Sequence, residues 1–515
     1  MKKTMLLVLV MIAFFLVAKN QGEAITFGAE YANPAWSKYL DFPKIAKAFA
    51  SIGIRSVKIQ KITWQDIEPD PPKNEVHRYQ WGELDKLINI FQSEGFTNME
   101  IVLEAASQWA TRSLTDKERS SARTSEQRKN PSLPPKKENW KSYANFIASI
   151  VERYDGDGVH DMPGLKHPIL EYEIESEAQG TFFWRATLEE YIELLQKAYQ
   201  AAKSANPNAR IILSGFALGD IPHPEVDPGQ RIEMIKDKGG LRGVEKKDWH
   251  EYIRFNRDAL KYKDYFDVVE FHSGENYPSI YNTAAWIRKE MKRNAYEKAI
   301  WAGDSYSTPT IVLGPVTPHP YPFSMTIEEF MKALANKNNT KHKEVKAWYR
   351  AEQSRLIVKK IVTSMEIGVE RINFYSFVDS PFAEKWLLRF FAPRAPFAYI
   401  TLISGLLDKD YQPYPAFFTY KLAVDKLKDA KFVKRLPLGS DHYGFEFSSK
   451  GRPIYVFWND KKGTVSYSVG SSFKTIKVTK IVTELNQQNP QVETIAVKDG
   501  KVELNLTSDP FFVEP

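Results

Sequence analysis

The chain has 515 residues, which is too long for one small domain and suits two or three. Its formal charge of +7 comes from 71 basic and 64 acidic residues, and so mild an excess does not indicate a nucleic-acid partner. The absence of cysteine excludes disulfides, thiolate catalysis and zinc–thiolate sites. Aromatic residues make up 13% of the chain, which suits plain core packing and also a cleft that stacks rings on sugars.

The N-terminus has the pattern of a signal peptide, predicted to span residues 1–24. Lys2 and Lys3 precede an apolar run, Thr4 to Ala18, that is too short to cross a bilayer. A small-x-small site at 22–24 predicts cleavage after Ala24, and an uncleaved N-terminal anchor is the alternative. We expect a secreted or cell-surface protein, with no stable membrane insertion after the signal is removed.

Residues 25–428 alternate between short apolar segments and amphipathic ones. The predicted strands span 25–29, 54–62, 99–104, 169–179, 210–215, 266–272, 299–304 and 371–377. The predicted helices span 42–52, 81–94, 140–154, 188–205, 249–260, 344–367 and 417–427. Eight strands alternating with helices predict an α/β fold, a (β/α)8 TIM barrel. Two segments, 111–141 and 305–343, interrupt this order and are expected to be long surface insertions; a partner-binding role for the basic first one is the alternative.

Residues 429–515 have a different character. Short alternating segments, separated by glycines, predict a small C-terminal β-sandwich domain. The predicted strands there span 443–447, 454–458, 465–469, 475–482, 491–497 and 502–506.

Four glutamates follow one another at every second position of the fourth predicted strand: Glu171, Glu173, Glu175 and Glu177. On a strand this spacing places all four on one face. A solvated edge strand would tolerate them, but the helical flanks favour a buried strand, where ionised carboxylates are costly unless paired or catalytic. Glu177 comes last, and the C-terminal end of a barrel strand is the usual active-site mouth.

The order of these parts resembles the clan A glycoside hydrolases, which are retaining glycosidases on (β/α)8 barrels. The segments that carry the resemblance are 53–57 with 64–69, 79–85, 154–158 with 161–166, and the C-terminal 509–514. The resemblance implies a carbohydrate substrate and O-glycosidic bond hydrolysis, without a metal or other cofactor. It also implies catalytic roles at two strand ends: Glu177, in Ser176-Glu177 where the family has Asn-Glu, as acid/base, and Asp304 at the position of the nucleophilic Glu.

Further residues are expected to bind the substrate. They are Glu175, Ser176, Glu270, His272, Tyr277, Trp109, Trp184, Trp301 and Tyr375. The alternatives are core packing for the tryptophans, a positioning role for His272, and a turn or capping role for Asp304.

Retaining hydrolysis needs two carboxyl groups about 5 Å apart, one protonated and one ionised. Asp304 is shorter than Glu by about 1.5 Å, so a wider gap that admits water, the inverting geometry, is an alternative. Ser176 lacks the amide that the family uses on the sugar. A catalytically silent carbohydrate-binding barrel and a transglycosylase are therefore the rival hypotheses.

Overall fold

The computed structural model describes residues 24–121, 131–237, 246–309, 323–461, 465–470 and 472–515. The predicted signal peptide lies outside the described residues except for Ala24, and so do the middle parts of both predicted insertions. Within the described ranges, none of the helices has the length and apolar character that crossing a bilayer requires.

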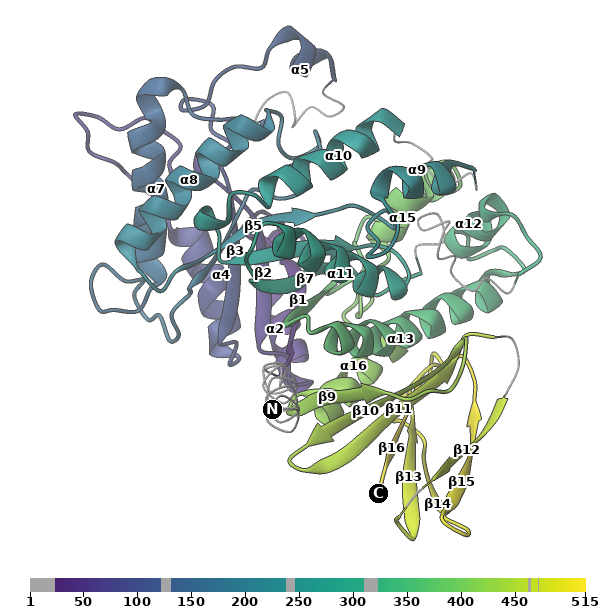
Figure 1. The fold of residues 1–515 in the computed structure, drawn as a ribbon. Helices are drawn as coiled ribbons and strands as arrows, with labels where there is room; N and C mark the ends of the chain where they lie inside the picture. The colour runs from purple at the N-terminus through teal and green to yellow at the C-terminus, as the bar shows by residue number, and fades with distance from the viewer. Residues whose placement is uncertain (1–23, 122–130, 238–245, 310–322, 462–464, 471) are drawn as a thin grey trace, which may run out of the picture.

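Eight parallel strands close into a barrel in chain order, and β8 pairs with β1. The strands are β1 (Thr26–Ala32), β2 (Ser56–Thr63), β3 (Asn98–Glu104), β4 (Glu171–Ile174), β5 (Arg210–Phe216), β6 (Val268–Ser273), β7 (Ala299–Tyr306) and β8 (Arg371–Tyr375). Helices surround this barrel in Figure 1. The predicted TIM barrel is confirmed.

The helices follow the periodicity of the sequence. In α4 (Gly82–Ser93), for example, Leu84, Leu87, Ile88 and Phe91 recur at helical spacing and are all buried. The others are α2 (Phe42–Ser51), α3 (Trp64–Ile67), α5 (Asp116–Ser121), α7 (Trp140–Tyr154), α8 (Leu188–Ala205), α9 (Pro228–Asp237), α10 (Lys246–Ala259), α11 (Pro278–Arg293), α12 (Ile327–Ala335), α13 (His342–Ile367), α14 (Trp386–Phe391), α15 (Pro396–Leu402) and α16 (Pro415–Leu427). The helix between β6 and β7, α11, is not among the helices that the sequence predicts.

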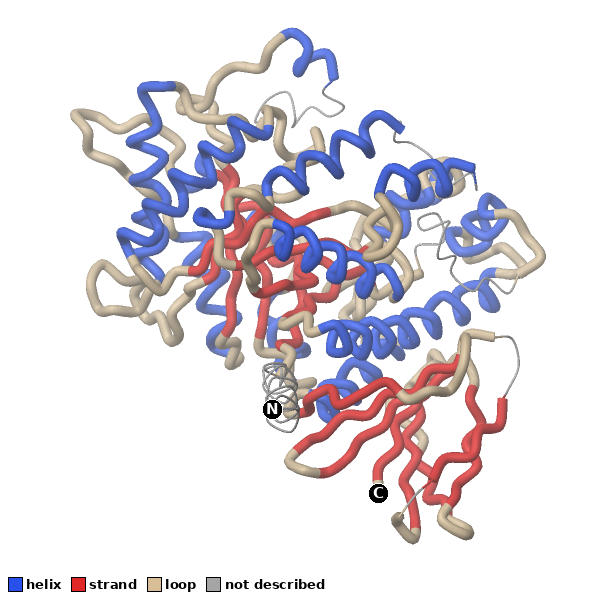
Figure 2. Tube along the Cα trace, in the orientation of Figure 1, coloured by secondary structure: helices blue, strands red, loops and turns tan. Residues whose placement is uncertain are grey.

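The C-terminal part is a separate antiparallel domain, as expected (Figure 2). A six-stranded sheet has the order β14 (Val492–Ala496), β13 (Thr475–Lys480), β16 (Phe511–Glu514), β11 (Arg452–Asn459), β10 (His442–Ser449), β9 (Ala430–Arg435), and β12 (Val465–Gly470) pairs with β15 (Lys501–Leu506). Phe447, Val456 and Trp458 join the hydrophobic core of the barrel, whereas Phe457 and Leu504 belong to a second core shared with β15. One face of the sheet therefore packs against the barrel, and the other packs against β15.

Candidate active site in the barrel mouth

The interior of the barrel is filled by charged side chains rather than by the branched aliphatic layers usual in this fold. Lys58 of β2 is fully buried, and its Nζ lies 2.6 Å from Glu173 and 3.2 Å from Glu100. The same ammonium group pairs with Glu270 of β6. Side chains from four strands meet in this way only along the barrel axis. The buried carboxylates, which would be costly alone, share this cation.

A second layer lies at the N-terminal end of the strands. Arg371, the first residue of β8, is 2.6 Å from Glu171 and 3.6 Å from Glu100. Its guanidinium group lies 3.8 Å from the ring centre of Trp301. Trp301 is therefore part of the barrel floor, and the structure places it away from the strand ends where Glu177 and Asp304 lie.

Three glycines make room for the polar interior. A Cβ atom on Gly303 would lie 1.8 Å from Cδ of Glu270, and one on Gly215 would lie 2.1 Å from Nε2 of His272. A Cβ atom on Gly28 would lie 2.0 Å from Oδ1 of Asn373. Distances this short are steric overlaps, so these polar side chains occupy space that only glycine leaves open.

Beyond β4 the regular alternation of the glutamates ends. Glu171 and Glu173 face the barrel interior, but Glu175 and Glu177 follow the strand with φ angles of 61° and 45°. These left-handed conformations are uncommon for residues other than glycine. The prediction that all four share one face is therefore wrong at Glu175, whose Oε1 accepts hydrogen bonds from the Ala105 backbone and the Ser132 hydroxyl, both at 2.7 Å.

Glu177 contacts His272 at the end of β6. Nδ1 of His272 lies 2.7 Å from Oε1 of Glu177, and Nε2 lies 3.4 Å from Oε1 of Glu270. Burial lowers the pKa of His272, but the hydrogen bonds to Glu177 and Glu270 outweigh it and leave that pKa well above the usual value. The side chain of Glu177 is 29% exposed, so it can reach a ligand while it contacts a buried histidine.

Asp304 stands beside His272, because these two residues are partners in the β6–β7 pairing. Burial raises the pKa of Asp304, with a further contribution from the charge of Glu177, while His272 and Lys58 oppose the rise. The two predicted catalytic residues thus lie at the same end of the barrel, and His272 adjoins both of them.

Glu30 of β1 is the partner of Asp304 that the sequence did not reveal. The two side chains are hydrogen-bonded, and each has a buried oxygen that no N–H or O–H group serves. Burial, followed by the charge of Asp304, raises the pKa of Glu30 well above its usual value. A single proton held between the two carboxyl groups serves both of them. A lone acid in a buried strand was the available signal.

Burial and neighbouring charges give the remaining carboxyl groups different pKa values. Burial raises the pKa of Glu173 to about 7 against the opposing charge of Lys58. Burial and then the charge of Glu104 raise the pKa of Glu175 to about 8. For Glu270 burial is outweighed by Lys58 and His272, and the pKa falls to about 2. Such separation of pKa values is typical of acid/base sites.

Aromatic rings line one side of the mouth. Tyr375, at the end of β8, packs against Tyr31 and Tyr306 with ring centres 5.2 and 4.8 Å away. From Tyr306 the contact continues to Phe397, which is 40% exposed, at 5.8 Å. Because Asp304 is close enough to raise the pKa of Tyr375, after the larger effects of burial and Tyr31, this wall adjoins the carboxyl groups. Tyr375 is the predicted binding residue best placed for a ligand.

The other predicted aromatic residues lie outside the mouth or in the core. Tyr277 donates a hydrogen bond to Asp460 at 2.5 Å and packs against Trp458, between the barrel and the C-terminal sheet. Trp184 is buried, with its Nε1 donating to the Thr187 carbonyl at 3.1 Å.

Trp109 is half-buried at the end of β3. It packs on Trp64 at 5.1 Å, and its Nε1 donates to the carbonyl of Glu68 at 2.8 Å. Ser176 is buried between Glu175 and Glu177. Both residues flank the mouth without a contact to Asp304.

Among the residues that the structure describes, two groups of side chains have the spacing that a metal ion would need. In the first, Glu173, Glu270 and His272 converge, but the ammonium group of Lys58 pairs with both glutamates and already supplies the positive charge there. The second, Asp155, Asp157 and Asp161, receives backbone N–H groups of its own loop.

No family model matches the chain, and no curated protein matches it. Similar solved structures include a family 39 glycoside hydrolase from the gut symbiont Bacteroides cellulosilyticus WH2, at 16% identity and a TM-score of 0.59, over 95% of this chain and 80% of that one. A family 39 enzyme from Xanthomonas axonopodis pv. citri has 12% identity and a TM-score of 0.54, over 96% of both chains.

A family 30 endoxylanase from Clostridium papyrosolvens C71 has 12% identity and a TM-score of 0.52, over 96% of this chain and 97% of that one. Each likeness extends through the barrel and into the C-terminal sheet domain. The chain therefore has the two-part fold of the clan A glycoside hydrolases.

Proposed function

We propose that the protein is an exported glycoside hydrolase that cleaves O-glycosidic bonds of an oligo- or polysaccharide. The observation that supports this proposal is that His272 contacts the carboxylate of Glu177 and is also the strand partner of Asp304. The fold that the chain shares with families 39 and 30 supports it. Export rests on the signal-peptide pattern of residues 1–24, and a mature N-terminus at Ile25 would support it.

In this mechanism Glu177 is the general acid, and the pair that it forms with His272 holds the proton to be delivered to the leaving oxygen. Burial raises the pKa of Asp304 and its hydrogen bond to Glu30 opposes this rise, and Asp304 acts on the anomeric carbon from the other side. It does so directly in a retaining reaction or through a water in an inverting one, and the configuration of the first product, read by NMR, distinguishes the two. Tyr375 and Tyr306 offer ring faces to the sugar.

The test measures turnover of aryl glycosides by the wild type and by Glu177→Gln. We expect kcat to fall by roughly 10²–10⁴-fold for substrates with poor leaving groups. The loss should be much smaller for dinitrophenyl glycosides, because a good leaving group needs no proton. Glu189→Gln, an exposed carboxyl on α8, is the matched control and should keep full activity.

Equal rates for wild type and Glu177→Gln on every substrate would remove Glu177 from the mechanism. Sugar binding by calorimetry without any release of reducing ends would favour the silent barrel instead.

A further inference from the structure

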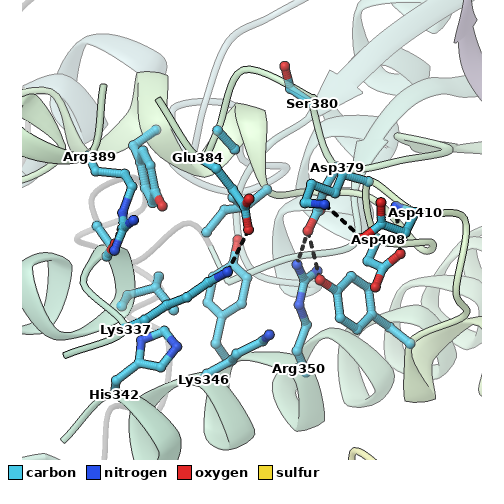
Figure 3. A pocket seen from close by; sticks show the side chains of 18 residues that line it. Lys337, His342, Lys346, Arg350, Asp379, Ser380, Glu384, Arg389, Asp408 and Asp410 are labelled. Carbon is cyan, nitrogen blue, oxygen red and sulfur yellow. Dashed lines mark hydrogen bonds and ion pairs between the residues drawn. The ribbon is translucent and has the colours of Figure 1, made fainter. Parts of the chain in front are cut away.

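A second polar cavity lies outside the barrel mouth, and neither Glu177 nor Asp304 lines it. This side pocket has a volume of about 310 Å³ and is formed by α12, α13, α14, α15 and the segments that follow β8. Its size falls at the lower end of the range for small-molecule sites, about 300 Å³. Figure 3 shows the polar side chains that surround it.

One face of α13 supplies much of the wall. His342, Lys346, Tyr349 and Arg350 line the pocket, and their spacing places them on the same side of a helix. In Figure 3, His342, Lys346 and Arg350 rise from this helix into the cavity. The positive end of the α13 dipole also lies here, because these residues occupy its first turns.

The four carboxylates of the pocket already have partners. Three of them form ion pairs: Asp379 with Arg350 at 2.6 Å, Glu384 with Lys337 at 2.6 Å, and Asp410 with Lys409 at 2.7 Å. The fourth, Asp408, accepts hydrogen bonds from the backbone N–H groups of Asp410 and Gln412 at 2.8 and 2.9 Å. Asp379 additionally accepts from the Tyr414 hydroxyl and the Gly405 N–H, both at 2.9 Å. These carboxylates therefore have little capacity left for another cation.

Two cations remain without a carboxylate. Throughout the described part of the chain, no acidic group forms an ion pair with Lys346. Burial followed by the charge of Arg350 lowers the pKa of Lys346, and the charges of Asp379 and Asp408 oppose this. Arg389 uses its Nε to donate to the Ala335 carbonyl, and the ends of its guanidinium group have no partner among the described residues. Figure 3 shows the two side chains on opposite sides of the pocket.

We propose that the side pocket binds the carboxylate of an acidic sugar, a hexuronic acid unit, between Lys346 and Arg389. A guanidinium group and a carboxylate form a planar, charge-assisted pair. Leu334, Tyr399 and Ile403 add apolar surface for the body of a sugar ring, which a bare inorganic anion would not use. The assignment to sugar rests on the proposed function; the assignment to an anion does not.

The experiment titrates the full-length protein with D-glucuronate by calorimetry, with D-glucose as the neutral match and inorganic phosphate as the free anion. We expect glucuronate to bind, glucose not to bind, and phosphate to bind more weakly. Lys346→Met and Arg389→Gln should each weaken glucuronate about 10-fold, the loss of one charge-assisted contact. Lys343→Met, an exposed neighbour on α13, is the matched control and should change nothing.

Three results would overturn the proposal: no glucuronate binding, equal binding of glucose, or unchanged affinity in both pocket variants. Phosphate binding as tightly as glucuronate would keep the anion site and remove the sugar. Thermal unfolding of each variant shows that it is folded. Aryl-glycoside turnover, measured in parallel, separates this proposal from the function of the barrel mouth, since either can fail while the other holds.

Discussion

The barrel axis and the side pocket are both rich in charged side chains, but these side chains are paired differently in the two regions. Along the axis Arg371, Lys58 and His272 each contact a buried or partly buried carboxylate. In the side pocket the carboxylates are paired and two cations are left over. The difference indicates that compensated charge holds a structure in place, whereas uncompensated charge is available to a ligand.

The largest expected effect is on the axis. Lys58→Met removes the cation that Glu100, Glu173 and Glu270 share and leaves Glu173 buried without an ion-pair partner, and we expect the free energy of unfolding to fall by about 3–5 kcal/mol. Urea unfolding measures it. Lys343→Met, an exposed lysine on α13, should change stability by no more than about 0.5 kcal/mol. A loss below about 1 kcal/mol in Lys58→Met would contradict the idea that this lysine compensates the axis.

An intermediate effect depends on pH. The pKa of Glu175 is raised from 4.5 to about 8, so the folded chain holds this proton more tightly than the unfolded chain does. Its contribution to stability is complete below pH 4.5 and is lost as the pH rises toward 8. A tenfold tighter hold on a proton corresponds to roughly 1.4 kcal/mol of stability.

Glu175→Gln keeps the acceptor for Ala105 and Ser132 and removes the titration. We therefore expect the stability of the variant to fall less steeply than that of the wild type over this pH range, by urea unfolding at fixed ionic strength. Parallel curves would show that Glu175 does not titrate there.

The smallest expected effect is in the side pocket. Lys346→Met removes a half-buried cation that forms no ion pair with a described residue, so stability should stay within about 0.5 kcal/mol of the wild type or rise. Thermal unfolding without added ligand is the measurement. A loss comparable to that of Lys58→Met would mean that Lys346 is structural, and the contrast between the two regions would disappear.

The barrel was predictable because its signal is local and periodic. Strands β1 to β8 and helix α4 are buried on one or both faces, and this burial shows in the sequence as apolar runs or as apolar residues at helical spacing. The end of β4 was harder, since the left-handed residues 175 and 177 depend on the tertiary contacts of Ala105, Ser132 and His272. Chain order alone does not encode such contacts.

The candidate site was only partly predictable for the same reason. Glu177, Asp304 and His272 could be named because strand ends of a barrel converge. Glu30 and Lys58 could not, because the role of each charged residue depends on partners far away along the chain. Tyr277 follows β6 closely, yet its hydroxyl turns to Asp460 in the other domain.

The three glycines of the barrel interior limit which substitutions this sequence can accept. At positions 28, 215 and 303 a methyl group would collide with Asn373, His272 and Glu270, respectively. A lineage derived from this chain can therefore replace any of these glycines only if it also gives up the polar partner. In the barrel interior, a glycine and its polar partner must therefore change together. A variant with only one of the two changes would have either a steric clash or a cavity.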